Sequence, residues 1–165
     1  MKGINFRWII ILLSVYIAAV LDATLAQRVA ILGAAPSFLF LLIGQFTMSM
    51  TRGKAMMFGF LIGTIQGSLA GSDIQHFIAG GVIGGLICAS ASTVGFEYSL
   101  LAVVSVTTVA SLIGLLVHVL VAPPPHVSRA LLDTLIGAMY NGVLAVPVYA
   151  LLHKGVGSSQ KLSSL

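Results

Sequence analysis

Ionised side chains are scarce in this sequence. Only 7% of its 165 residues are Asp, Glu, Lys or Arg, whereas 58% are hydrophobic and the mean hydropathy is +1.09. In an ordinary soluble domain about a quarter of the residues are charged. So few charges could not cover the surface of a soluble fold. The composition therefore excludes a water-soluble domain and predicts an integral membrane protein.

Cysteine and catalytic motifs are scarce as well. Cys88 is the only cysteine, which excludes an internal disulfide and a CxxC-type metal or redox site. The sequence contains no GxSxG elbow, P-loop, HExxH motif or pair of carboxylates at catalytic spacing. We therefore expect a protein that is not an enzyme and that holds no cofactor.

Clusters of basic residues are also missing. The formal net charge is +4, but the eight Lys and Arg residues are scattered singly along the chain. This distribution argues against a nucleic-acid partner and fits a membrane-topology signal instead.

Six apolar runs make up most of the sequence, at residues 8–25, 35–50, 55–70, 74–91, 98–121 and 130–152. Crossing a bilayer takes about 20 apolar residues. The second and third runs are short, so we expect them to lie in thinned membrane or partly inside the protein. The polar–apolar alternation of a barrel strand is absent, which favours helices. We predict an all-α bundle of six transmembrane helices, a single domain over residues 1–154, followed by a disordered cytoplasmic tail over residues 155–165.

The basic residues predict the orientation of this bundle. With six crossings and a cytoplasmic N-terminus, Arg28 and Arg129 lie outside, and the remaining basic residues lie inside: Lys2, Arg7, Arg52, Lys54, Lys154 and Lys161. This bias follows the positive-inside rule and predicts that both termini are cytoplasmic. The first run also resembles a secretory signal peptide, but the later runs are equally apolar, so we expect it to be retained as a helix.

Glycine recurs every four residues along the third run, at Gly59, Gly63, Gly67 and Gly71. In a helix this spacing leaves a groove on one face, where another helix can approach until the backbones touch. The fourth run repeats the spacing in two pairs, Gly80 with Gly84 and Gly81 with Gly85. Either these two helices pack on each other within the protein, or a transmembrane helix of a partner docks on the same surface.

A few polar side chains lie within or beside the runs. Gln66 lies next to the glycine face, where an unpaired amide is costly, so we expect it to hydrogen-bond to a neighbouring helix. Arg129 and Asp133 are four residues apart and are expected to form an ion pair near the membrane surface. A proton or substrate relay through Asp133 is the alternative. Asn141 and Pro147 predict an interhelical hydrogen bond and a local kink in the sixth helix.

The predicted topology places His76, His118 and His126 near the outer surface, at a depth close to that of Asp73. Imidazole and carboxylate groups can ligate a metal ion. These residues come from separate loops or helix ends and lack a ligand spacing such as HxxxH. We therefore expect interfacial histidines and no metal.

Several segments together resemble the rod shape-determining protein MreD family. Residues 21–42, LDATLAQRVAILGAAPSFLFLL, are similar to the end of its first helix, its outer loop and the start of its second helix. Residues 59–87, GFLIGTIQGSLAGSDIQHFIAGGVIGGLI, resemble its third and fourth helices. Residues 131–152, LLDTLIGAMYNGVLAVPVYALL, resemble its last helix, where an Asn and a Pro are common. Family members often carry Asp at the positions of Ser37 and Gly67, so no role of those carboxylates is carried over.

The resemblance implies a non-catalytic inner-membrane subunit of the bacterial elongasome. Such a subunit binds MreC and helps to couple MreB filaments to the glycosyltransferase RodA and its partner transpeptidase during peptidoglycan synthesis, which supports rod cell shape. It also implies a six-helix bundle like the substrate-binding subunit of energy-coupling-factor transporters. The glycines of the third helix and the polar positions around them are the residues that we expect at partner contacts.

Two other functions are compatible with a small membrane bundle. A vitamin-binding subunit of an energy-coupling-factor transporter would share the size and the fold, and the AxxxA spacing of Ala19 and Ala23 resembles the docking motif of such subunits. A vitamin pocket also needs convergent polar and aromatic groups, and only 8% of the residues are aromatic. A small channel or transporter would show inverted repeats or several buried charges, and the sequence shows neither.

Overall fold

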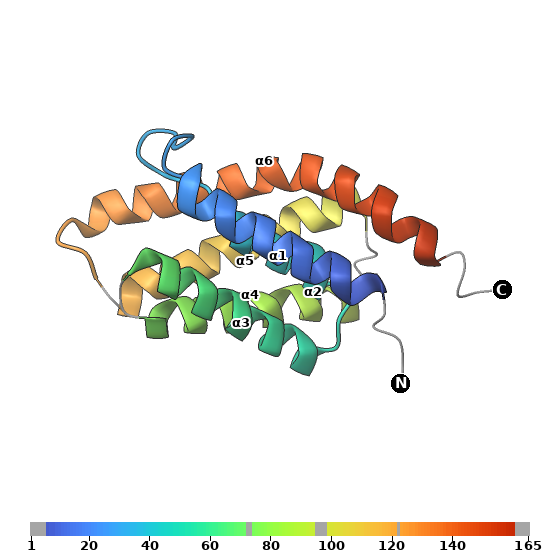
Figure 1. Ribbon diagram of the computed structural model, residues 1–165. Helices are drawn as coiled ribbons and strands as arrows, with labels where there is room; N and C mark the ends of the chain where they lie inside the picture. The colour runs from blue at the N-terminus through green and yellow to red at the C-terminus, as the bar shows by residue number, and fades with distance from the viewer. Residues whose placement is uncertain (1–5, 72–73, 95–98, 122, 161–165) are drawn as a thin grey trace.

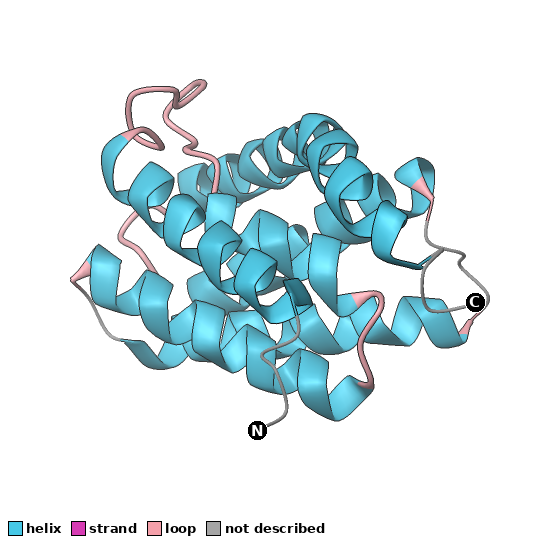
Figure 2. Cartoon of the chain, turned by 45° about the vertical axis from the view of Figure 1, so that its right-hand side comes forward, coloured by secondary structure: helices cyan, strands magenta, loops and turns pink. Residues whose placement is uncertain are grey.

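The computed structural model describes residues 6–71, 74–94, 99–121 and 123–160. Within these ranges the chain is helical apart from its loops and an isolated β-bridge between Ile31 and Ala34 (Figures 1 and 2). The helices of the described residues are α1 (Phe6–Thr24), α2 (Phe38–Thr47), α3 (Arg52–Ala70), α4 (Ile74–Thr93), α5 (Leu100–Val121) and α6 (Val127–Gln160). The all-α fold class predicted from the sequence is confirmed for this part of the chain.

Successive helices run in alternating directions, so the start of α1 and the end of α6 lie at the same end of the molecule (Figure 1). Three described segments are long and apolar enough to cross a membrane: residues 74–91 in α4, 100–121 in α5 and 127–152 in α6. Residues 8–24 of α1 and 38–47 of α2 form shorter apolar helices. These lengths make α4, α5 and α6 the strongest candidates for membrane spans.

The shortest of these helices, α2, lies at the centre of the molecule. Its 10 residues extend about 15 Å, and every residue from Leu39 to Thr47 is buried. It contacts α1, α3, α4, α5 and α6. A length of about 15 Å is half of the hydrocarbon thickness of a typical bilayer. Its apolar side chains are therefore buried by the surrounding helices and not by lipid.

The bounds of α2 differ from those of the apolar run that predicted it. The run was predicted to begin at residue 35, but the helix begins at Phe38 because Ser37 is its N-cap, with φ −113° and ψ 104°. The Ser37 hydroxyl accepts a hydrogen bond from the N–H of Phe40 at 3.2 Å. Hydropathy does not distinguish these extended residues from the helix that follows them.

The last helix is longer than expected. The disordered tail was predicted from residue 155, but α6 continues to Gln160, and residues 161–165 lie outside the described part of the chain. The predicted apolar run ends at Leu152, yet a helix once formed adds hydrogen bonds residue by residue through polar sequence. No proline follows Pro147 to stop it. Pro147 itself lies inside α6, and the helix curves over its neighbours in Figure 1.

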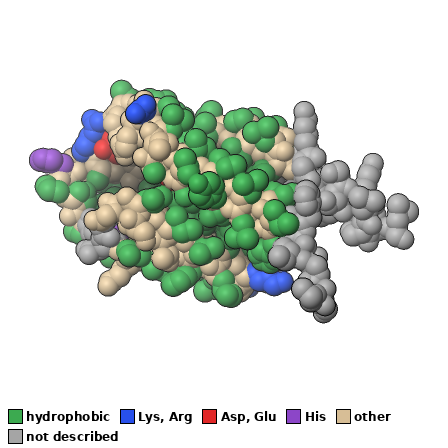
Figure 3. All heavy atoms as spheres, viewed as in Figure 1, with side chains coloured by type: hydrophobic (Ala, Val, Ile, Leu, Met, Phe, Trp, Pro, Cys, Tyr) green, Lys and Arg blue, Asp and Glu red, His purple; other side chains and the backbone are tan. Residues whose placement is uncertain are grey.

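The outer surface is largely apolar along the helices. In Figure 3, hydrophobic side chains cover much of the visible face, whereas Lys and Arg gather towards the two ends. Large hydrophobic side chains are exposed on each of the outer helices, among them Tyr16, Met57, Leu86, Leu101 and Met139. This distribution matches a protein whose sides face hydrocarbon and whose ends face water.

Candidate functional site

The helices α3 and α4 meet at their glycines, with the backbones in contact. A Cβ atom placed at Gly59 would collide with the carbonyl group of Gly81, and one at Gly63 would collide with the carbonyl group of Phe77. At Gly67 a Cβ would lie 2.9 Å from the first residue of α4. These α3 glycines are buried. The helix α4 therefore covers the face on which a partner helix was the alternative occupant. We call this contact between the two helices the α3–α4 seam.

The glycines of α4 serve two different faces. Gly81 belongs to the α3–α4 seam, whereas Gly80 and Gly84 face the opposite direction. A Cβ at Gly80 would lie 2.8 Å from the carbonyl oxygen of Gly114 in α5, and one at Gly84 would lie 3.3 Å from the ring of Phe40 in α2. The small residues of α4 thus let three neighbours approach it, which the spacing of the pairs did not reveal.

Gly71 lies outside the seam in which its spacing placed it. It is the C-cap of α3, with φ +62°, a left-handed conformation that glycine adopts without steric cost. A Cβ there would meet no atom within 4 Å. The last glycine of the four-residue period therefore ends the helix and makes no packing contact.

A carboxylate near the end of α1 holds the start of α2. Asp22 accepts hydrogen bonds from the backbone N–H groups of Phe38 at 2.7 Å and of Leu39 at 3.1 Å, and from the hydroxyl of Ser37 at 3.5 Å. The first N–H groups of a helix have no partner within the helix and carry a partial positive charge. A carboxylate supplies both a hydrogen-bond acceptor and a negative charge, so Asp22 fixes the point at which α2 begins.

Ser37 joins this helix start to three more helices. Its backbone N–H donates to Oδ1 of Asn141 in α6 at 3.0 Å, and its hydroxyl accepts from Nε2 of Gln66 in α3 at 2.9 Å. Nδ2 of Asn141 donates in turn to the hydroxyl of Ser111 in α5 at 3.2 Å. We call Asp22, Ser37, Gln66, Ser111 and Asn141 the α2 polar cluster. It ties the start of α2 to α1, α3, α5 and α6.

The chemistry of the α2 polar cluster is that of a structural network. Asn141 and Ser111 are fully buried, and the Asp22 carboxylate is occupied by three donors. Among the described residues, Oε1 of Gln66 is buried without a hydrogen-bond partner. In an apolar surrounding such hydrogen bonds stabilise one arrangement of helices, because separating the donors from the acceptors would leave both unpaired.

The sequence pointed to Gln66 and Asn141 but not to Asp22, Ser37 or Ser111. A Ser directly before an apolar run is a helix-start signal, so Ser37 could have been identified. Nothing in the local sequence indicates that a residue in α1 reaches the amides of residues 38 and 39.

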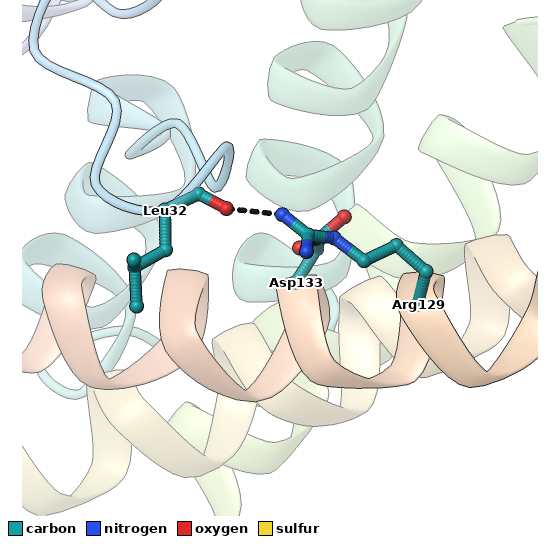
Figure 4. A network of polar contacts seen from close by, with 3 residues as sticks. All are labelled: Leu32, Arg129 and Asp133. Carbon is teal, nitrogen blue, oxygen red and sulfur yellow. Dashed lines mark hydrogen bonds and ion pairs between the residues drawn. The ribbon is translucent and has the colours of Figure 1, made fainter.

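Arg129 and Asp133 form an ion pair at the start of α6. Nε of Arg129 lies 3.0 Å from Oδ1 of Asp133, with side chains 59% and 33% exposed. Figure 4 shows the same guanidinium pointing to the backbone carbonyl of Leu32, to which it donates a hydrogen bond. Leu32 and Gly33 have positive φ angles of 54° and 93°. Arg129 therefore connects α6 to the tight turn of the loop between α1 and α2.

Two of the three histidines that were predicted near the outer surface come together between α4 and α5. The rings of His76 and His118 are 4.2 Å apart, and Phe77 lies 4.5 Å from the first and 5.1 Å from the second. His126 lies just before α6 and is exposed, while Asp73 is outside the described residues. Within the described part of the chain, no three His, Cys, Asp or Glu residues lie close enough together to hold a metal ion.

Comparison with known proteins identifies one family. Residues 2–155 match the model of the family described as rod shape-determining protein MreD. The matched range contains the α3–α4 seam and the whole α2 polar cluster. No curated protein and no solved structure gave a match.

Proposed function

The chain belongs to the rod shape-determining protein MreD family, and we propose that it is a non-catalytic subunit of the elongasome in the bacterial inner membrane. In this proposal it binds MreC, and through MreC it is linked to MreB, RodA and the elongation transpeptidase. Its role is to support the peptidoglycan synthesis that gives the cell a rod shape.

The family match over residues 2–155 is the observation that carries this proposal. It spans nearly the whole chain. A rigid bundle with exposed apolar sides also suits a subunit that works by contact with other membrane proteins, because such contacts form within the bilayer.

We further propose that all six helices form one membrane bundle with both termini in the cytoplasm, resembling the substrate-binding subunit of energy-coupling-factor transporters. The alternating helix directions support an even number of passes (Figure 1). Arg28 and Arg129 lie at one end of the bundle, and Arg52 and Lys54 lie at the start of α3, at the other. In this arrangement α2 is held within the bundle by protein and completes its pass through the loops on either side.

The glycines serve partner binding by maintaining the shape of the bundle. Gly59, Gly63 and Gly67 are covered by α4, so a partner meets other surfaces, whose positions depend on the α3–α4 seam. Replacement of Gly63 or Gly67 with Leu should therefore abolish folding, and MreC association with it. Folding of these variants with normal MreC binding would contradict this role.

Affinity purification of the tagged full chain from native membranes tests the proposed function. We expect MreC and RodA to be recovered with the wild-type protein and with a Gly53→Leu control, because a Cβ at Gly53 meets no atom within 4 Å. Absence of MreC from the wild-type sample, in membranes where MreC is present, would overturn the proposal.

A binding assay distinguishes the energy-coupling-factor alternative. Purified protein should show no tight binding of thiamin, biotin or riboflavin if it is a scaffold subunit. Tight binding of any one of them would favour the transporter function. In the structure, Ala23 of the AxxxA pattern is exposed and Ala19 is half-buried.

A further inference from the structure

A groove lies between α4 and α5 on the side of the molecule. It has a volume of about 490 Å³ and is lined by Leu86, Ile87, Ser90, Ala91, Val94, Ser105, Val106 and Val109. This volume lies within the range of small-molecule sites. All of the α5 lining and most of the α4 lining belong to segments apolar enough to span a membrane. The groove therefore opens towards lipid.

The two helices that form the groove are in close contact further along α4. At Gly80 they are so close that a Cβ would lie 2.8 Å from the carbonyl oxygen of Gly114. The groove spans residues 86–94 of α4, which is about 12 Å of helix. A partner helix that crosses the hydrocarbon core is about 30 Å long, so the groove suits a smaller occupant.

The lining of the groove is almost entirely apolar along its length. Ser90 and Ser105 are the polar members of the lining, and apolar residues lie on both sides of them along α4: Leu86 and Ile87 deeper in the bundle, and Val94 nearer its end. Hydrocarbon suits such a lining, so an acyl chain of a lipid can fill the groove.

A cation completes the pattern at the membrane surface. Arg52, the first residue of α3, donates a hydrogen bond to the hydroxyl of Thr93 at 3.1 Å, and that hydroxyl donates to the carbonyl of Ser90 at 2.7 Å. Ser90 lines the groove. Arg52 is exposed, and a guanidinium has five N–H donors in a geometry that suits phosphate oxygens. Lys54 is also exposed in the same turn of α3.

We propose that the α4–α5 groove binds an acyl chain of an anionic phospholipid whose phosphate is held by Arg52. The net negative headgroup distinguishes such a lipid from a zwitterionic one, because basic side chains near the surface attract anionic lipid. The lipid belongs to the leaflet on the side of the molecule where α1 starts and α6 ends.

Native mass spectrometry of the full chain in detergent tests this proposal. Phosphatidylglycerol and phosphatidylcholine with identical acyl chains are added separately, and the retained lipid is measured. We expect wild-type protein to retain phosphatidylglycerol about fivefold better. Arg52→Gln should remove this preference while leaving phosphatidylcholine retention unchanged. Arg28→Gln, at the opposite end of the bundle, is the matched control and should keep the preference.

Variants that fill the groove test the place of the acyl chain. Ala91→Phe and Val109→Phe, on opposite walls, should each reduce retention of both lipids, with helical content unchanged by circular dichroism. Val109 is exposed, whereas Ala91 packs partly against the core, so Val109→Phe can serve if Ala91→Phe fails to fold. Persistence of the phosphatidylglycerol preference in Arg52→Gln, or undiminished lipid retention in a folded groove variant, would overturn the proposal. So would loss of a protein partner from the groove variants with lipid retention intact.

Discussion

The carboxylate of Asp22 in α1 lies 2.7 Å from the backbone nitrogen of Phe38, the first residue of α2. A side chain from one helix thus supplies the acceptor that the first turn of the next helix lacks. Ser37 adds its own hydroxyl as an N-cap to the same turn. The start of the central helix is therefore defined from two directions.

Replacement of Asp22 with Ala should lower the stability of the whole bundle. The variant loses the acceptor of two backbone N–H groups at the start of α2, and hydrogen bonds to a charged group contribute about 1.5–3 kcal/mol each. We expect a loss of about 2–3 kcal/mol, measured by thermal unfolding in detergent. Thr24→Ala is the matched control, because the exposed hydroxyl of Thr24 bonds only within α1, to Val20. Equal stability of D22A and T24A would contradict this role of Asp22.

The effect of Ser37→Asp should depend on residue 22. In the wild-type background a second carboxylate would lie beside Asp22, since the Ser37 hydroxyl is 3.5 Å from Oδ2 of Asp22, and like charges at this distance are unfavourable. In the Asp22→Ala background the new carboxylate would replace the lost one, because Asp is as good an N-cap as Ser. We expect S37D to lower the melting temperature of the wild type and to raise that of D22A. A change of the same sign in both backgrounds would show that the two positions do not share one role.

Replacement of Asn141 with Leu should also be destabilising. The substitution removes the acceptor for the N–H of Ser37 and the donor to Ser111 and leaves buried polar groups unpaired. Each such group costs about 1–3 kcal/mol. We expect a loss of about 2–4 kcal/mol, again by thermal unfolding. Met139→Leu, two residues away on an exposed face, should remain near wild type, and a similar result for N141L would argue against the network.

Leucine in the α3–α4 seam should prevent the native fold. A Cβ at Gly63 already collides with backbone atoms of α4, and backbone cannot move aside as a flexible side chain can. Overpacking typically costs about 1–3 kcal/mol and more where relaxation is blocked. We expect Gly63→Leu to be recovered as aggregate in size-exclusion chromatography and Gly53→Leu as a single species. A monodisperse G63L protein would show that the seam can open.

The Arg129–Asp133 pair should matter more for the loop than for global stability. The ion pair is exposed and such pairs contribute about 0–1 kcal/mol, so Asp133→Asn should change the melting temperature little. Arg129→Gln also removes the hydrogen bond to Leu32. Hydrogen exchange in the loop over residues 25–36 should therefore increase in R129Q with little change in α4 and α5. Unchanged hydrogen exchange in the loop of R129Q would mean that the turn is stable without the hydrogen bond from Arg129.

Part of the site could be anticipated from spacing alone. Gln66 was expected to bond to another helix and does so through Ser37, and Arg129 and Asp133 meet because residues four apart share a face of a helix. The ion pair could be predicted because both residues lie in the same helix. The hydrogen bond of Gln66 could be predicted because an unpaired amide is costly in an apolar surrounding.

The scarcity of charge and the positions of the apolar runs determined by themselves that the chain is a helical membrane protein, because each depends on the local transfer of side chains from water. Only the tertiary structure decided that α2 is enclosed, that Gly80 and Gly81 serve opposite faces, and that Asp22 caps a helix 16 residues away. Those outcomes depend on which helices become neighbours. The helix surfaces are all similarly apolar, so their sequence does not indicate which of them pack together.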